Sequence, residues 1–147
     1  MEQINTFSIS RLLHALELSE QNKDYFFVEM GREPLYTDEP FRTLTYTLLL
    51  LTEGEICFNA GLVSHLIEAP ALIAVAPTVI RSFTRTEFKP KMEAIFFTEQ
   101  FLLEDFSDVF FLGKFTFLED NERHVFPLSL VHFKKASILF RQLYDVL

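Results

Sequence analysis

The transition from strand to helix in this chain lies within Ile95-Phe96-Phe97-Thr98-Glu99-Gln100-Phe101-Leu102-Leu103. From Phe41 up to Thr98, short apolar segments alternate with turn residues at a spacing of about ten residues. This spacing favours a barrel or a sandwich over βαβ units. After Thr98 the pattern changes to that of a helix. The stretch from Phe41 to Phe106 therefore predicts a small β-barrel that leads into a helix and encloses a protected pocket.

Seven segments have the apolar, β-branched and aromatic composition of strands. Turn residues separate them, notably Glu53-Gly54 and Asn59-Ala60-Gly61, where glycine can take a positive φ. The predicted strands are Tyr25–Met30, Phe41–Thr52, Glu55–Asn59, Val63–Glu68, Leu72–Ala76, Ile80–Thr86 and Met92–Thr98.

The strand predicted at Phe41–Thr52 has two distinct faces, because strand side chains alternate. One face carries Thr43, Thr45 and Thr47, and we expect these polar residues to face outward. The other face carries Arg42 and Tyr46, which this assignment places inside the barrel.

Helical segments are predicted on both sides of the barrel. Near the N-terminus, Ser8 is a plausible N-cap for a helix with apolar residues at helical spacing. We expect one sensor domain over 1–147, divided into an N-terminal helical segment (1–24), the barrel (25–98) and a helical dimerisation segment (99–147). Since the chain ends within an apolar pattern, we expect the full-length protein to continue.

Near the C-terminus, apolar residues recur at alternating steps of three and four, as in a coiled-coil seam. Such a seam predicts a dimer interface, but a helix that docks on its own barrel has the same spacing. The residues of the seam are Phe133, Ala136, Phe140, Leu143 and Leu147.

Composition restricts the possible functions. The chain has 147 residues, 49% of them hydrophobic, with 18 phenylalanines, so it forms about one domain with a core of its own. Its net charge of −8 makes this polypeptide by itself a poor DNA binder. One cysteine, Cys57, indicates a reducing compartment. Without a signal peptide, and with a longest apolar run of only Leu48–Leu51, the chain is expected to be cytoplasmic.

Three groups of residues resemble the sensor domain of bacterial AraC-type (AraC/XylS) transcription regulators. They are Glu39-Pro40-Phe41-Arg42 with Tyr46, Leu50 and Thr52-Glu53-Gly54-Glu55, then Ala71-Leu72-Ile73-Ala74-Val75-Ala76-Pro77, and Phe96-Phe97-Thr98-Glu99-Gln100-Phe101-Leu102. The resemblance implies a mainly β, cupin-like double-stranded β-helix (a jelly-roll barrel) that binds a small effector. It also implies helices that form a homodimer and, beyond this chain, a DNA-binding domain with two helix-turn-helix units.

The chain departs from that family pattern in two ways. Pro70-Ala71 and Pro77-Thr78 stand where many members have Pro-Gly, so we expect these turns to differ. Arg81 stands before Phe83 where members often have histidine, which exchanges a neutral hydrogen-bonding group or metal ligand for a fixed cation.

Metal-dependent or nucleophilic chemistry is not expected. Metallo-cupins need two histidines one residue apart, and none of His14, His65, His124 and His132 has that partner. A Cys57–His65 pair across a hairpin lacks an orienting third group. Glu53, Glu55 and Glu93 are interpreted as solvated residues. We therefore expect no metal, no cofactor and no enzyme activity.

Ligand binding is the favoured chemistry. The pocket candidates are Arg42, Tyr46, Phe58, Arg81, Phe83 and Phe96. Inward-facing Arg42 and Arg81 would need a partner, because buried charge is costly. Three alternatives remain: an internal acid such as Glu93, an anionic ligand, or a position at the barrel mouth. The effector could be anionic or rich in hydroxyl groups.

The sequence therefore predicts the small-molecule sensing and dimerisation domain of an AraC-type transcription regulator. Two alternatives stay open. One is a stand-alone cupin enzyme, an isomerase or dioxygenase, and the other is a structural dimerisation module whose barrel is filled with side chains.

Overall fold

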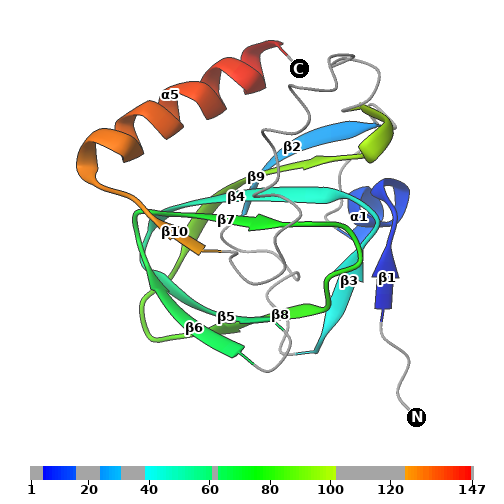
Figure 1. Ribbon diagram of the computed structural model, residues 1–147, viewed down its shortest axis with the longest axis horizontal. Helices are drawn as coiled ribbons and strands as arrows, with labels where there is room; N and C mark the ends of the chain where they lie inside the picture. Colours follow the sequence, from blue (N-terminus) through cyan, green and yellow to red (C-terminus); the bar gives the residue numbers. More distant parts are fainter. Residues whose placement is uncertain (1–4, 16–23, 31–38, 61–62, 102–124, 147) are drawn as a thin grey trace.

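Two five-stranded β-sheets face each other in the computed structural model of the protein, which describes residues 5–15, 24–30, 39–60, 63–101 and 125–146 (Figure 1). The mainly β fold predicted from the sequence is confirmed. The elements are β1 (Asn5–Phe7), α1 (Ile9–Ala15), β2 (Tyr25–Met30), β3 (Phe41–Thr43), β4 (Tyr46–Glu53), β5 (Glu55–Ala60), β6 (Val63–Glu68), β7 (Ala71–Val75), β8 (Arg81–Arg85), β9 (Lys91–Phe97), β10 (Val125–Pro127) and α5 (Leu130–Val146).

The chain passes repeatedly from one sheet to the other. One sheet has the order β1-β3-β8-β5-β6 and is called the first sheet below. The second sheet has the order β10-β7-β4-β9-β2. Neighbouring strands are antiparallel, except that β1 runs parallel to β3. The strands β1 and β10 join the sheets from outside the range 25–98 that the sequence analysis assigns to the barrel.

The segment Phe41–Thr52 differs from its prediction in two respects. It forms two strands, β3 in the first sheet and β4 in the second, with a bend at Leu44–Thr45 between them. The outward orientation expected for Thr43, Thr45 and Thr47 is wrong, because all three are buried. Their hydroxyl groups find hydrogen-bond partners inside the barrel, which removes the cost of burying them.

The inner core fills the space between the sheets. Alternate residues of the strands point into it, for example Leu49 and Leu51 from β4. Helix α1 adds Ile9, Leu12 and Leu13 to the same core. Ser8 caps this helix, as predicted: the amide of Arg11 donates to its Oγ at 3.3 Å.

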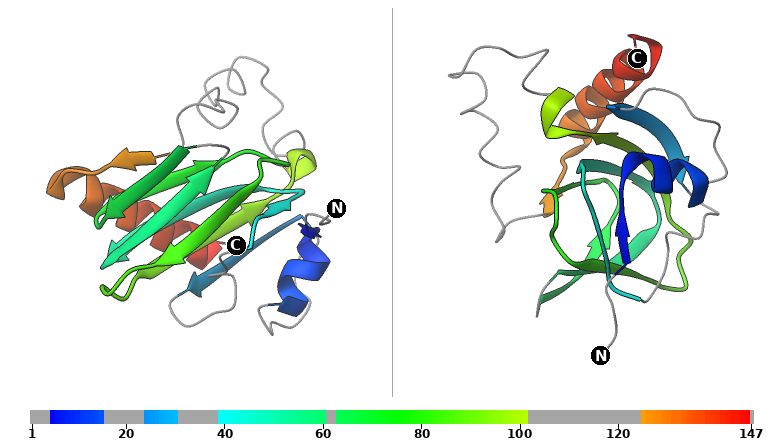
Figure 2. Two further views of the ribbon diagram at one scale, coloured as in Figure 1. Left: turned by 90° about the horizontal axis from the view of Figure 1, so that it is seen from below. Right: turned by 90° about the vertical axis from the view of Figure 1, so that its right-hand side faces the viewer.

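A second core, called the outer core below, lies on the other side of the second sheet, under α5. Figure 1 shows this helix lying across the outer face of that sheet, and the left view of Figure 2 shows the first sheet in front with α5 behind. Phe140 of α5, 5% exposed, packs against Tyr46, Leu50 and Phe97 of the sheet. The second sheet therefore carries an apolar core on each face, whereas the outer face of the first sheet carries polar residues.

In the described part of the chain, two turns have a residue with positive φ. Gly54, between β4 and β5, has φ +77°, and a Cβ placed there would collide with the carbonyl oxygen of Lys89. Thr78, between β7 and β8, has φ +69° although it is not glycine. The prediction that the missing glycine changes this turn is therefore wrong in that respect, since threonine takes the left-handed conformation itself.

We predict that Gly54→Ala lowers the free energy of unfolding by more than about 2 kcal/mol, because alanine adds left-handed strain and a collision with a backbone carbonyl. Urea unfolding followed by circular dichroism measures this. Glu53→Ala, which removes only the exposed ion pair between Lys91 and Glu53, is the control and should cost less than about 1 kcal/mol. Equal losses for the two variants would contradict the close approach at Gly54.

Candidate functional site

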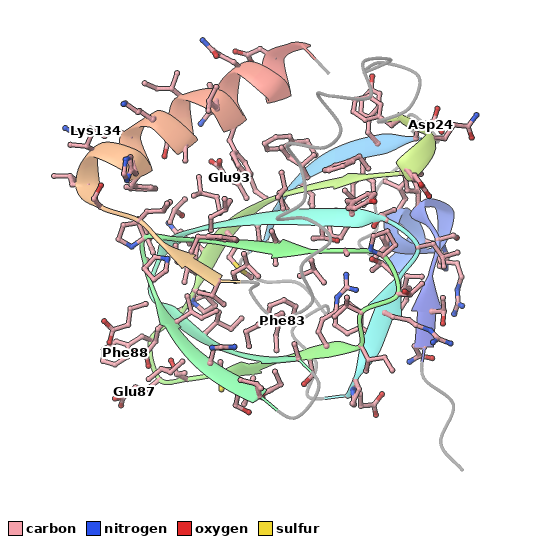
Figure 3. All side chains as sticks on the ribbon, in the orientation of Figure 1. Asp24, Phe83, Glu87, Phe88, Glu93 and Lys134 are labelled. Carbon is pink, nitrogen blue, oxygen red and sulfur yellow. The ribbon has the colours of Figure 1, made fainter. Side chains whose placement is uncertain are left out.

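A cavity lies in the inner core, between the two sheets. Its walls are carbon atoms, and it has room for about one water molecule. In Figure 3 the labelled Phe83 lies in this interior. The residues that line the cavity are Phe41, Thr47, Leu49, Val75, Arg81, Phe83 and Phe96.

Arg81 is a buried cation at this cavity. Its side chain is 2% exposed. One guanidinium nitrogen, Nη1, donates to the carbonyl oxygen of Val79 at 2.9 Å. The other, Nη2, donates to Oγ1 of Thr43 at 2.8 Å and to Oγ1 of Thr47 at 3.3 Å. The guanidinium carbon also lies 5.0 Å from the centre of the Phe41 ring, within the range of a cation–π interaction.

No carboxylate in the described part of the chain forms an ion pair with Arg81. Burial lowers the pKa of its guanidinium to about 9, so the group remains cationic at neutral pH. Glu93, the internal acid considered above, is not its partner. It belongs to β9, pairs with Leu50 of the outer core, and therefore faces away from the cavity. The charge of Arg81 is balanced by hydroxyl and carbonyl dipoles instead.

The six predicted pocket residues divide into two groups. Arg81, Phe83 and Phe96 line the cavity, and Phe58 is fully buried in the same core. The inward positions expected for Arg42 and Tyr46 are wrong, because the alternation along this segment is opposite to the predicted one.

Arg42 and Tyr46 both lie on the side of their sheet that faces away from the cavity. Arg42 donates from Nε to Oγ1 of Thr6 at 2.9 Å, on the outer side of β3. Tyr46 stacks on Phe97 beneath α5, with ring centres 5.4 Å apart. The cavity instead receives Thr47, which the sequence analysis places outside. Because side chains alternate along a strand, Thr47 shares its face with the apolar residues Phe41, Leu49 and Leu51. This grouping was the sequence signal that could have placed Thr47 inside.

The described seam residues of α5 pack toward the second sheet. Phe133, Ala136 and Phe140 all pack in the outer core, which is the docking alternative that their spacing left open. Leu143 and Leu147 lie outside the described side chains. The dimer interface predicted at this helix stays a prediction. Four other apolar residues of α5 are 58–66% exposed, namely Leu130, Val131, Ile138 and Leu139.

Charged groups meet where the second sheet faces α5. Glu93 of β9 lies directly opposite Glu29 of β2 in the register of the two strands. In Figure 3 the Glu93 side chain lies on the α5 side of the sheet. Partial burial raises the pKa of Glu93, the positive charge of Arg141 on α5 opposes this, and the negative charge of Glu29 adds to it.

Other chemistry considered from the sequence is not brought together. In the strand register, Cys57 lies opposite Leu66, and His65 lies opposite Phe58. The side chains of Cys57 and His65 therefore point to opposite faces of the first sheet. The Cys57 thiol lies 3.9 Å from Oδ1 of Asn59, and the His65 ring stacks on Phe58. In the described ranges, no three His, Cys, Asp or Glu side chains are grouped as metal ligands would be. Nor does any described helix have the length and apolar character needed to cross a membrane.

Comparison with solved structures identifies the fold. Over 84% of its length, at 10% sequence identity and a TM-score of 0.53, the chain superposes on an apo variant of ToxT from Vibrio cholerae strain SCE256. A second structure of ToxT from Vibrio cholerae gives 12% identity and a TM-score of 0.51 over 80% of the chain. The chain shares its fold with ToxT. It spans about half the length of the ToxT chains, 49% and 48%. No family model and no curated protein matches the sequence.

We predict that Glu93→Gln stabilises the protein at neutral pH. Because the pKa of Glu93 is raised in the folded state, the folded protein binds the carboxyl proton of Glu93 more tightly than the unfolded protein does. The stability contributed by the protonated carboxyl is complete below about pH 4.3, the ordinary glutamate value, and is lost as the pH rises through the raised pKa. Melting temperatures of the wild type and the variant, measured across this range, should therefore agree in acid and diverge toward neutrality. The exposed Glu99→Gln serves as the control. A difference that is independent of pH would contradict the assignment.

Proposed function

We propose that this chain is the effector-sensing and dimerisation domain of an AraC-type transcription regulator. The observation that carries the proposal is the fold shared with ToxT, an AraC-family regulator, over 84% of the chain. The sequence motifs described above support the same family independently of the fold. On this proposal, DNA is bound by a domain outside these 147 residues, in agreement with the net charge of −8.

The proposed effector is a small anionic or hydroxyl-rich molecule that binds at Arg81. A guanidinium inside an apolar core is an anchor for a carboxylate, a phosphate or a row of hydroxyl groups, since it presents several donors in a fixed plane. The cavity beside it holds about one water molecule, so an effector needs the interior to open. Binding would then favour the opened arrangement over the closed one, which is a population shift.

The small size of the cavity favours a second candidate function. A barrel filled with side chains could serve as a structural dimerisation module without any effector. In that case Arg81 only ties strands together. The two candidates differ in whether a small molecule stabilises the folded chain.

We predict that members of a panel of small carboxylates, phosphate esters and polyols raise the melting temperature of this chain by binding its folded state. Arg81→Gln should abolish the effect, because it removes the anchor. Arg42→Gln is the matched control, since Arg42 lies on the outer face of β3, and it should leave the shift unchanged. Circular dichroism verifies that both variants fold. A shift that survives Arg81→Gln contradicts the anchor, and a panel without any shift favours the structural module.

We also propose that two copies associate through the exposed surface of α5, which includes the apolar residues Leu130, Val131, Ile138 and Leu139. Leu139→Glu should weaken the dimer at least about thirtyfold, because the new carboxylate would be desolvated without a partner. Sedimentation velocity over a range of concentrations measures this. Leu66→Glu, an equally exposed leucine on β6, is the control and should leave the dimer intact. A wild-type chain that is monomeric at every concentration contradicts the interface.

A further inference from the structure

The turn between β7 and β8 touches both cores of the protein. Residues 76–80 leave the second sheet after Val75 and enter the first sheet at Arg81. Ala76 is buried in the outer core with Phe140 of α5. Val79 packs against the inner core and the outer core at once. The turn therefore provides a direct physical connection from the cavity to the helix.

The turn is held from the cavity side by hydrogen bonds to β3 and to Arg81. The amide of Thr78 donates to the carbonyl oxygen of Thr43 at 2.8 Å. The carbonyl oxygen of Val79 accepts the bond from Nη1 of Arg81 at 2.9 Å. The hydroxyl of Thr43 accepts the bond from Nη2 of Arg81 and a further bond from the hydroxyl of Thr45. Two backbone groups of the turn thus depend on a network centred on Arg81 and Thr43.

The same turn contains the strained backbone at Thr78. A positive φ is unfavourable for a β-branched residue, and such a conformation persists only where the surroundings impose it. The bond from the Thr78 amide to the Thr43 carbonyl oxygen joins this residue to the network centred on Arg81 and Thr43. If the network is broken, we expect the turn to relax to a less strained conformation, with Val79 placed differently.

We propose that the β7–β8 turn transmits the state of the Arg81 network to helix α5. This inference rests on the proposed sensing function and gives it a mechanism. An anion that binds the guanidinium competes with Thr43, Thr47 and the Val79 carbonyl for the same N–H groups. The released turn relaxes at Thr78, Val79 moves, and the packing of the outer core against α5 changes. The exposed surface of α5 is then presented differently to a second copy.

Amide hydrogen exchange of the full chain tests this coupling without any effector. Thr43→Val keeps the shape of the side chain and removes the hydroxyl that accepts from Arg81. Peptides covering 77–81 and 130–146 should both exchange about tenfold faster in this variant, because a hydrogen bond to a charged group is lost. A peptide from β9 reports global opening, and both increases are measured relative to it. Thr52→Val removes a hydroxyl that bonds the Lys91 carbonyl at 3.1 Å and should leave both peptides unchanged.

Val79→Ala identifies the route. In this background, Thr43→Val should still accelerate exchange in the turn but no longer in α5, because the side chain that joins the two cores is shortened. If Thr43→Val accelerates amide exchange in the turn but not in α5 while Val79 is still present, the proposal is overturned. Unchanged exchange in the turn overturns it too.

If Thr43→Val fails to fold, Thr78→Gly takes its place. Glycine removes the cost of the positive φ while every bond of the network is kept, so exchange should slow in both the turn and α5. An effect confined to the turn overturns the coupling. Since no effector enters these measurements, their failure is distinct from a negative result of the binding panel, which bears on the sensing function itself.

Discussion

The burial of the Arg81 guanidinium among neutral partners is the constraint around which the barrel is organised. A cation inside an apolar core is tolerated only if its N–H groups are satisfied, and here hydroxyl and carbonyl oxygens from three separate places satisfy them. These oxygens belong to Thr43 on β3, Thr47 on β4 and Val79 in the turn before β8. One side chain therefore joins both sheets and the bend between β3 and β4.

The second sheet separates two apolar layers with different roles. On its inner side the strands close over the cavity, and on its outer side they receive α5. Along β4, Thr47, Leu49 and Leu51 belong to the first layer, and Tyr46 and Leu50 to the second. Since residues of both layers belong to the same strands, a displacement of these strands changes the packing on both faces of the sheet. This arrangement suits a domain in which a buried event is read out at a helix.

The sequence predicts most of this fold but not the orientation of its most important segment. The bounds of β2 and β6 coincide with their predicted ranges, because local composition and turns define them. In Phe41–Thr52 the period is right and the faces are inverted. The threonines resemble a solvent-facing row, and their burial depends on Arg81, more than 30 residues away. Tyr46 is likewise covered by a helix that begins at Leu130. Such long-range partners are not visible locally, and the polar character of the threonines outweighed the one local signal, the grouping of Thr47 with Leu49 and Leu51 on one strand face.

The two ends of the barrel are closed by different means. At the end where β4 meets β5, main-chain groups bind each other directly: Gly54 accepts from the amide of Ala69, Phe88 accepts from that of Glu55, and no side chain can be inserted at Gly54. At the far end, the main-chain bond from Thr78 to Thr43 is accompanied by the hydrogen bonds of the Arg81 side chain. A molecule that enlarges the interior would thus find the end of the barrel at Gly54 fixed and the end at Arg81 able to adjust. Expansion of the interior would tilt the strands outward about that end. The second sheet would then carry α5 with it.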